Sequence, residues 1–242
     1  MRRWCAILLV AVLCLFFLCW SVSAQGSDWE QSRIRMVREQ LKARGIEDSR
    51  VLQAMREVRR HLFVPEDVRS AAYRDGPLPI GHGQTISQPY IVALMTQLAS
   101  VDPGDRILEV GTGSGYQAAV LARLADRVYS VEIVEELARE ARQKLKELGY
   151  DNVSVRIGDG FRGWPEHAPF DAIVVTCSPP EIPSPLKEQL APGGRLIIPV
   201  GERQQELKVV SKNQEGAIEK ESVIPVRFVP MTGPGVRQQG SD

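Results

Sequence analysis

The stretch that decides the fold is RILEVGTGSGY, residues 106–116. The apolar run Arg106–Val110 predicts a buried strand, and Gln117–Leu124 has the spacing of apolar residues that is typical of a helix. Between them, glycines at positions 111, 113 and 115 allow a tight turn and the close approach of a ligand. The helix that follows offers unpaired backbone N–H groups where it begins. This stretch therefore predicts a ligand-binding turn between a strand and a helix.

The spacing of these glycines argues against a dinucleotide ligand. A dinucleotide-binding loop carries the pattern G-x-G-x-x-G, in which the third glycine packs the helix against the strand. Here the pattern is G-x-G-x-G, and Tyr116 holds the position of that third glycine. NAD and FAD are therefore disfavoured, and a glycine-rich turn without any ligand remains an alternative.

Two acidic residues further along the chain favour a nucleoside ligand. Glu132 ends the next predicted strand, 21 residues after Gly111, where a carboxylate can accept both ribose hydroxyls. Asp159 stands between Gly158 and Gly160 after the third predicted strand, and it could receive an adenine amino group. Each has a structural alternative, because acidic residues are common where helices begin and Asp-Gly is a common turn. Together with the glycine turn, both residues predict a nucleoside site.

From residue 103 onward, short apolar runs alternate with helical runs. This alternation predicts an α/β fold with a doubly wound, mostly parallel sheet of the Rossmann-like kind. Seven strands are expected at 106–110, 127–131, 153–157, 171–175, 195–200, 207–211 and 224–229, the last two as an antiparallel pair. Helices are expected at 117–124, 134–148 and 185–190.

The residues before this pattern form an N-terminal helical elaboration of the same domain. Helical spacing runs over 28–44, ended by Gly45, and again from Asp48 to Val58. Residues 60–90 are rich in Pro and Gly and are too long for a simple connector, which favours a functional loop. A single domain over 25–242 is expected, with helices and a substrate loop in 28–100 and the donor-binding core in 101–233.

The first 24 residues have the features of a targeting segment. Arg2 and Arg3 precede an uncharged, mostly apolar run over Trp4–Trp20, and Val22 and Ala24 fit a cleavage site after Ala24. A cleaved secretory signal is the first expectation, and an uncleaved membrane anchor the second. Basic residues before the apolar run would place the domain outside the cytoplasm in either case. A mis-assigned start is the third reading.

Composition excludes several classes of function. The chain has 30 basic and 30 acidic residues, so it lacks the basic surface that bulk binding of nucleic acid requires. Three of the four cysteines lie in the first 20 residues, which leaves Cys177 alone in the rest of the chain. Neither an internal disulfide nor a cysteine-ligated zinc is expected there, and no metal site is predicted. Cys177 follows a buried-looking strand and is expected to be a small core residue.

Several stretches together resemble the protein-L-isoaspartate O-methyltransferases, a family of class I S-adenosylmethionine-dependent methyltransferases. The resemblance extends from about residue 30 to residue 233, and the stretch 78–90 is the part most specific to this family. The stretches are 78–90 (LPIGHGQTISQPY), 109–116, 158–160 (GDG), 169–173 (PFDAI), 179–183 (PPEIP), 192–194 (PGG) and 227–230 (RFVP). Beyond Gly233 the tail departs from the family pattern.

The resemblance implies the activity, the ligands and the site. The activity is methyl transfer from S-adenosylmethionine to the free carboxylate of L-isoaspartyl residues in damaged proteins, which starts their repair to aspartate. Ser87 matches the active-site serine, within a substrate-binding stretch of Gln84, Thr85, Ile86 and Ser87. The donor-binding positions are Glu109, Gly111, Thr112, Gly113, Gly115, Glu132, Asp159, Gly160 and, more weakly, Thr232. A cytoplasmic monomer is implied, which conflicts with the targeting segment; translation from Met36 would resolve the conflict but would delete part of the first helix.

Methyl transfer to a carboxylate is consistent with the residues of this chain. The donor is already activated and the acceptor carboxylate is ionised at neutral pH, since its reference pKa is about 4. No general base is required, and Ser87 is expected to hold the acceptor as a hydrogen-bond donor. Three alternatives stay open: a methyltransferase with another acceptor, a non-catalytic donor-binding module, and an NAD-dependent oxidoreductase. Against an amino-group acceptor, residues 176–181 read TCSPPE and lack the Asn/Asp and aromatic that flank Pro-Pro in such enzymes.

Overall fold

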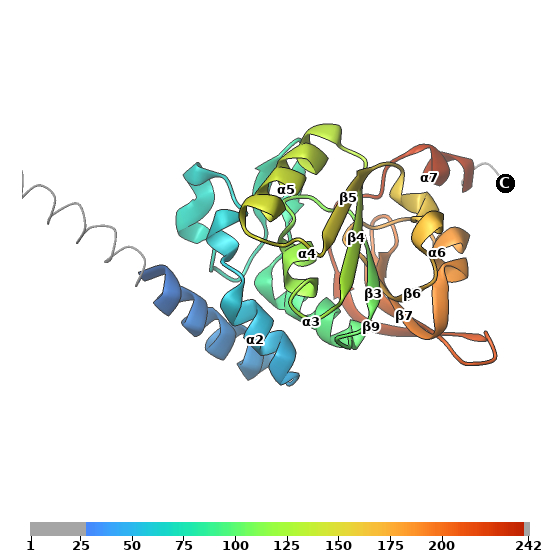
Figure 1. Ribbon diagram of the computed structural model, residues 1–242, viewed down its shortest axis with the longest axis horizontal. Coiled ribbons are helices and arrows are strands. Elements are labelled where there is room, and N and C mark those ends of the chain that lie inside the picture. Colours follow the sequence, from blue (N-terminus) through green and yellow to red (C-terminus); the bar gives the residue numbers. More distant parts are fainter. Residues whose placement is uncertain (1–27, 240–242) are drawn as a thin grey trace, which may run out of the picture.

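The computed structural model describes residues 28–239 and has a seven-stranded sheet with helices on both faces (Figure 1). In order across the sheet, the strands are β5 (Val153–Ile157), β4 (Arg127–Glu132), β3 (Arg106–Val110), β6 (Phe170–Val175), β7 (Leu190–Val200), β8 (Gln205–Lys212) and β9 (Ile218–Val226). The first five are parallel, and β8 alone runs antiparallel to both of its neighbours. The expected α/β fold with a mostly parallel seven-stranded sheet is confirmed.

The strand order fixes where a ligand can bind. From β3 the chain continues to β4 and β5 on one side, and it then returns to β6 on the other side of β3. The connections that leave the carboxyl ends of β3 and β6 therefore diverge. Ligands of open α/β sheets bind in the crevice at such a switch point, and the glycine turn after β3 lies at this crevice.

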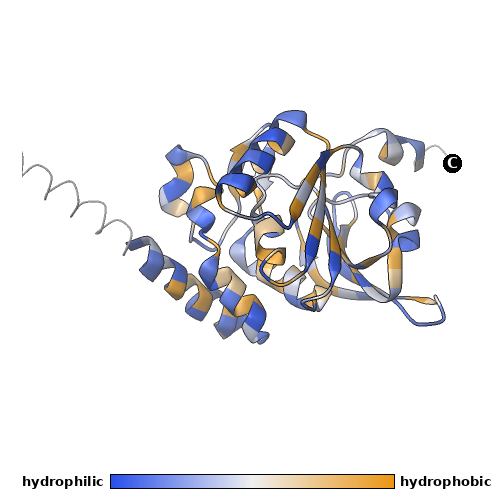
Figure 2. Cartoon of the chain, viewed as in Figure 1, coloured by the Kyte–Doolittle hydropathy of each residue, from blue (hydrophilic) through white to orange (hydrophobic). Residues whose placement is uncertain are grey.

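Alternate side chains of the central strands enter two separate hydrophobic cores. Ile107, Ala172 and Ile197 pack in the larger core with α3 (Pro89–Ala99), α4 (Tyr116–Leu121), α5 (Glu135–Glu147) and the N-terminal helices. Leu108, Ile173 and Leu196 pack in the smaller core with α6 (Ser184–Glu188) and with Val236 of α7 (Pro234–Gln239). Figure 2 shows apolar residues concentrated in the sheet and polar residues on the outer helices.

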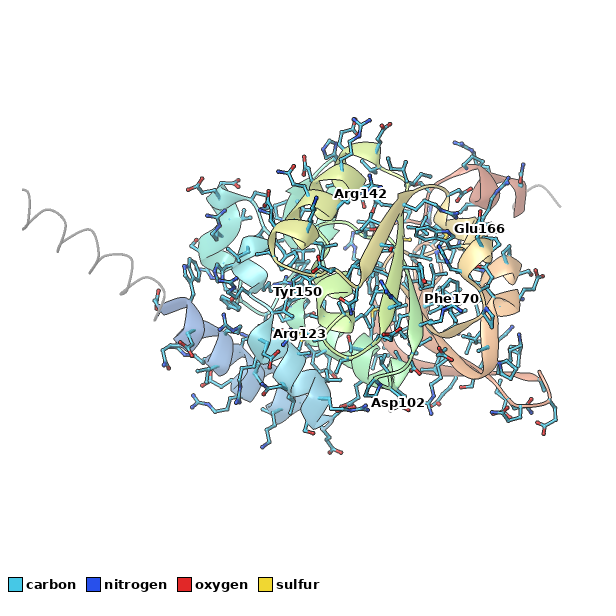
Figure 3. The ribbon with its side chains drawn as sticks, viewed as in Figure 1. Asp102, Arg123, Arg142, Tyr150, Glu166 and Phe170 are labelled. Carbon is cyan, nitrogen blue, oxygen red and sulfur yellow. The ribbon has the colours of Figure 1, made fainter. Side chains whose placement is uncertain are left out.

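The N-terminal layer begins with a helix over residues 28–36 that continues as a π-helical turn, η1 (Val37–Leu41), and a 3-10 turn, η2 (Lys42–Arg44). Gly45 ends it with a φ of 89°, as its sequence position predicts. α2 (Ser49–Glu57) follows, with the Asp48 side chain accepting the N–H of Arg50 at 2.8 Å. Arg123, which is labelled in Figure 3, follows α4 and joins it to this layer, because its Nε donates to the Glu57 carboxylate at 2.8 Å.

The segment 60–90 is ordered. It contains two 3-10 turns, η3 (Arg60–Leu62) and η4 (Glu66–Ala71), and the antiparallel hairpin β1 (Leu78–Gly81) and β2 (Gln84–Ile86). Its tight turn uses positive φ values at Gly81, His82 and Gly83. The hairpin leads directly into α3, so Ser87 and Gln88 are held between two regular elements.

Two strand predictions were wrong at their boundaries. β7 begins at Leu190 and not at 195, because Pro192–Gly194 still belong to the strand. β9 covers Ile218–Val226 and not 224–229. β9 is an edge strand, and its residues Glu219–Ser222 are exposed and polar, so this half of the strand carries no apolar pattern from which to predict it. Residues 227–229 therefore lie beyond the sheet.

The remaining short helices are η5 (Gly160–Arg162) and η6 (Pro165–His167). Between residues 28 and 239, none of the helices is both long and apolar enough to span a bilayer. The predicted targeting segment, residues 1–24, lies outside the described residues.

Candidate active site

The glycine turn after β3 has the conformation that its sequence predicts. Gly111, Gly113 and Gly115 all have positive φ values, of 95°, 51° and 86°. A Cβ on Gly111 would lie 2.4 Å from the Thr176 Oγ1, so only glycine fits against the end of β6. The Thr176 hydroxyl donates to the Gly111 carbonyl at 2.6 Å and holds the turn in place. Gly115 instead packs against Leu145 of α5, so its role is helix packing.

Glu132 connects the end of β4 to this turn. Its two carboxylate oxygens accept the backbone N–H groups of Gly113 at 2.8 Å and Val134 at 2.9 Å. Each oxygen has lone-pair capacity left after these bonds. The carboxylate can therefore accept two further donors, such as a pair of vicinal hydroxyls.

A first cavity lies over the carboxyl ends of β3, β4 and β6. Among the predicted donor-binding residues, it is lined by Gly111, Gly113, Glu132, Gly160 and Thr232. Gln84 and Thr85 of the hairpin also line it, although they were predicted for the substrate. Gly160 has no room for a side chain, because a Cβ there would lie 2.4 Å from Val110.

Glu109 and Thr112 lie behind the turn and do not line this cavity. Glu109 is fully buried and accepts a short hydrogen bond from Ser130, whose hydroxyl lies 2.5 Å from that of Thr112. Burial raises the pKa of the Glu109 carboxyl to about 8; the Ser130 bond opposes the rise and the nearby Glu132 charge adds to it. These hydroxyls link β3, β4 and the glycine turn into one buried polar chain.

Asp159 is engaged by the C-terminal segment. Its carboxylate accepts the N–H of Phe161 at 3.1 Å and the N–H of Gly235, in α7, at 2.8 Å. It does not line the first cavity, whereas its neighbour Gly160 does. In this structure Asp159 therefore joins η5 to α7, next to the predicted adenine end of the site.

A second cavity adjoins the first and contains Ser87. Thr85, Thr176 and Val229 line both cavities, so these three residues mark the junction between them. Ile86 points away, since it is buried in the larger core. The predicted substrate residues are thus divided: Gln84 faces the first cavity, Ser87 the second, and Thr85 both.

Sequence reasoning missed several cavity residues. Thr176 and Cys177 follow β6, and their position at the switch point is the signal that could have identified them. Cys177 packs against the smaller core, as expected, and it also lies in the cavity wall, where burial raises the pKa of its thiol to about 12. The end of β9 and the segment that follows it, residues 225–232, also line the two cavities. Among residues 28–239, no group of three or more His, Cys, Asp or Glu side chains could hold a metal ion.

The glycine turn, the acidic residue ending the next strand and the switch-point cavity define a class I methyltransferase that takes S-adenosylmethionine as its donor. Residues 32–235 match the family described as protein-L-isoaspartate(D-aspartate) O-methyltransferase. The chain belongs to this family.

Individual relatives support the assignment to this family. A "Protein-L-isoaspartate O-methyltransferase 2" from Polaromonas sp. is 60% identical over 188 residues, which cover 77% of this chain and 89% of the relative. The Opitutus terrae relative is 61% identical over 202 residues, covering 83% and 86%. A solved Plasmodium falciparum structure, described as a beta-aspartate methyltransferase in complex with S-adenosyl-L-homocysteine, is 31% identical with a TM-score of 0.72 and covers 83% of this chain and 98% of that chain.

Proposed function

We propose that the chain transfers the methyl group of S-adenosylmethionine to the free carboxylate of L-isoaspartyl residues in damaged proteins and peptides. The resulting ester starts the repair of these residues to aspartate. The observation that carries this proposal is the pair of adjoining cavities that meet at Thr85, Thr176 and Val229. One cavity fits the donor, and the other fits a peptide whose carboxylate must meet the donor at the junction.

The first cavity has the features that the donor needs. Glu132 has free lone pairs for the ribose hydroxyls. Gly111 and Gly160 line the cavity and must be glycine, because a Cβ at either position would clash with Thr176 or Val110. Asp159 lies beside Gly160, and each of its oxygens accepts only one N–H, from Phe161 or Gly235, which leaves lone pairs for an adenine amino group. The residues present therefore fit S-adenosylmethionine.

The chain's own task is alignment and exclusion of water. S-adenosylmethionine supplies a methyl group that is already activated on a sulfonium. Ser87 donates a hydrogen bond to the acceptor carboxylate and directs one oxygen toward the junction. No general base is needed because the acceptor is ionised at neutral pH. Alignment of this kind can lower a barrier by about 7–11 kcal/mol in favourable cases.

The test is methyl transfer to two synthetic peptides that differ only in one residue, L-isoaspartate or normal aspartate. Radiolabelled methyl should enter the isoaspartyl peptide alone and should be released by mild base, as an ester is. Label on both peptides would favour a broader acceptor range. No label on either, with donor binding intact in a titration, would favour a binding module without this activity.

We also propose that the protein is exported and acts as a monomer. Support for export comes from the basic, apolar and small-residue regions of residues 1–24. Cell fractionation with sequencing of the mature N-terminus tests it. An N-terminus near residue 25 in a non-cytoplasmic fraction is expected, whereas cytosolic activity with an N-terminus at Met36 or beyond would contradict it. Light scattering of the purified protein tests the monomer.

A further inference from the structure

The second cavity carries a single charge. Of the described residues that line it, all are apolar or neutral except Arg227. Ser87, Gln88 and Thr85 supply hydrogen-bonding groups, and the remaining lining is mainly Pro, Val, Ile and Phe. A cation in such a cavity selects for negative charge in whatever the cavity binds.

Arg227 stands on a firmly held segment. The next residue, Phe228, donates its N–H to the Gln205 side chain at 2.6 Å, and its carbonyl accepts from the same side chain at 3.1 Å. The carbonyl of Val229 accepts the N–H of Ser178 at 2.9 Å. The backbone that carries Arg227 is therefore fixed against the end of β6 and the start of β8.

Arg227 is exposed and makes no hydrogen bond or ion pair with any residue between 28 and 239. Other arginines of the molecule have such partners: Arg123 pairs with Glu57, and Arg156 pairs with Glu166. Arg227 lines the second cavity, and a guanidinium carries five donors in a planar fork that matches a carboxylate.

The position of Arg227 separates it from the reacting carboxylate. Val229 lies at the junction, two residues further along the chain. Two residues span at most about 7 Å of backbone, which is the length of roughly two residues of a bound peptide. An acceptor carboxylate at the junction therefore leaves Arg227 within reach of the residues beside it in the substrate.

We propose that Arg227 makes the enzyme prefer isoaspartyl peptides that carry an acidic residue next to the isoaspartate. The inference rests on the proposed function, since it names the substrate class for the same site. Arg227 acts as a specificity residue: it binds the flanking carboxylate and takes no part in methyl transfer.

The experiment compares isoaspartyl peptides of one sequence with Glu, Gln or Lys on either side of the isoaspartate. The wild-type protein should show a kcat/KM roughly threefold to tenfold higher for Glu than for Gln on the preferred side, mostly through KM. The preference should shrink in 0.5 M salt, because exposed charges are screened. Arg227→Gln should bring the Glu-to-Gln ratio toward one, Arg227→Glu should favour Lys, and Arg227→Lys should restore part of the preference for Glu.

Arg127→Gln is the matched control, because Arg127 is exposed at the opposite, amino end of the strands. It should keep the full preference for Glu. Donor affinity by calorimetry, measured for every variant, shows that the protein is folded. The inference would be overturned if the wild-type protein methylated all three peptides at equal rates, or if the preference for Glu survived Arg227→Gln. Either result would leave the proposed function standing. No transfer to any isoaspartyl peptide by wild-type protein would overturn the proposed function itself.

Discussion

The position of Ser87 in the second cavity depends on the alternation of side chains in the residues before it. Along Thr85–Ser87 the side chains alternate, so that Ile86 enters the core while the residues on either side of it face the cavities. The buried isoleucine anchors the hairpin and fixes the two hydroxyls. Sequence resemblance could identify Ser87, but only the structure shows that it faces a cavity separate from the donor's.

Ser87→Ala should lower kcat/KM for an isoaspartyl peptide roughly 10- to 100-fold, the usual value of a hydrogen bond to a charged group. Donor affinity should be unchanged because Ser87 does not line the first cavity. Steady-state kinetics measures the loss of kcat/KM, and calorimetry measures the donor affinity. Ser154→Ala, on the exposed face of β5, is the control. An equal loss of donor binding and activity would contradict this role.

Glu109 predicts a pH dependence of stability. Its folded pKa of about 8 lies above the ordinary value of 4.5, so the unfolded chain releases this proton more readily. The contribution of the group to stability is therefore full below about pH 4.5 and is lost as the pH rises toward 8. Glu109→Gln keeps an oxygen for the Ser130 hydroxyl and removes the ionisation.

The gain in free energy of unfolding from Glu109→Gln should consequently be larger at pH 9 than at pH 5. Urea unfolding at both pH values measures it, with Glu219→Gln on the exposed edge strand β9 as control. A gain of the same size at both pH values would show that Glu109 does not titrate in this range.

At the scale of elements, the C-terminal segment closes the adenine end of the site. Gly233 has a φ of 136° and lies between Ile133, after β4, and Asp159, after β5. A Cβ there would lie 2.7 Å from the Asp159 Oδ1 and 2.9 Å from the Ile133 Cδ1. The segment thus touches the two loops that flank the predicted adenine position.

Gly233→Ala should weaken donor binding by about tenfold or more, because overpacking of this kind costs about 1–3 kcal/mol and displaces Asp159 and Ile133. Gly216→Ala is the control: its φ is also positive, at 86°, but no atom lies within 4 Å of the added Cβ. Calorimetric titration of S-adenosylhomocysteine compares the two variants. Equal affinities would show that this segment is remote from the donor.

Elements were predictable from sequence where burial imposed a pattern. The strands β3, β4 and β6 are buried in the sheet and were located within a residue or two. β9 and the β1–β2 hairpin were not, because exposed edges and short turns need no apolar period. In the site, the glycine turn after β3 was predictable, because its positive φ values require glycine. The engagement of Asp159 by Gly235 was not, since residues 76 positions apart carry no local signal.

At the scale of the whole molecule, the N-terminal layer and the sheet share one hydrophobic core. Met55 of α2 is fully buried in it, with its Sδ 3.8 Å from the Tyr116 hydroxyl of α4. Trp29 of the first helix stacks on His61 with ring centroids 4.9 Å apart. These contacts favour a molecule that unfolds as one unit.

Met55→Ala should destabilise the protein by about 2–5 kcal/mol through the cavity it leaves. Amide hydrogen exchange should then accelerate together in α2 and in β3 and β6, far apart in the sequence. Arg56→Ala, on the exposed face of the same helix, is the control. Faster exchange confined to α2 would show that the N-terminal layer unfolds separately from the sheet.

The central claim is that the two adjoining cavities bring the donor and an isoaspartyl carboxylate together. The most direct test is a crystal structure of the protein with S-adenosylhomocysteine and an isoaspartyl peptide. We predict the ribose at Glu132, the sulfur at the junction of Thr85, Thr176 and Val229, and the free carboxylate within hydrogen-bond distance of the Ser87 hydroxyl. A peptide carboxylate bound away from Ser87, or a nucleoside outside the first cavity, would contradict the account.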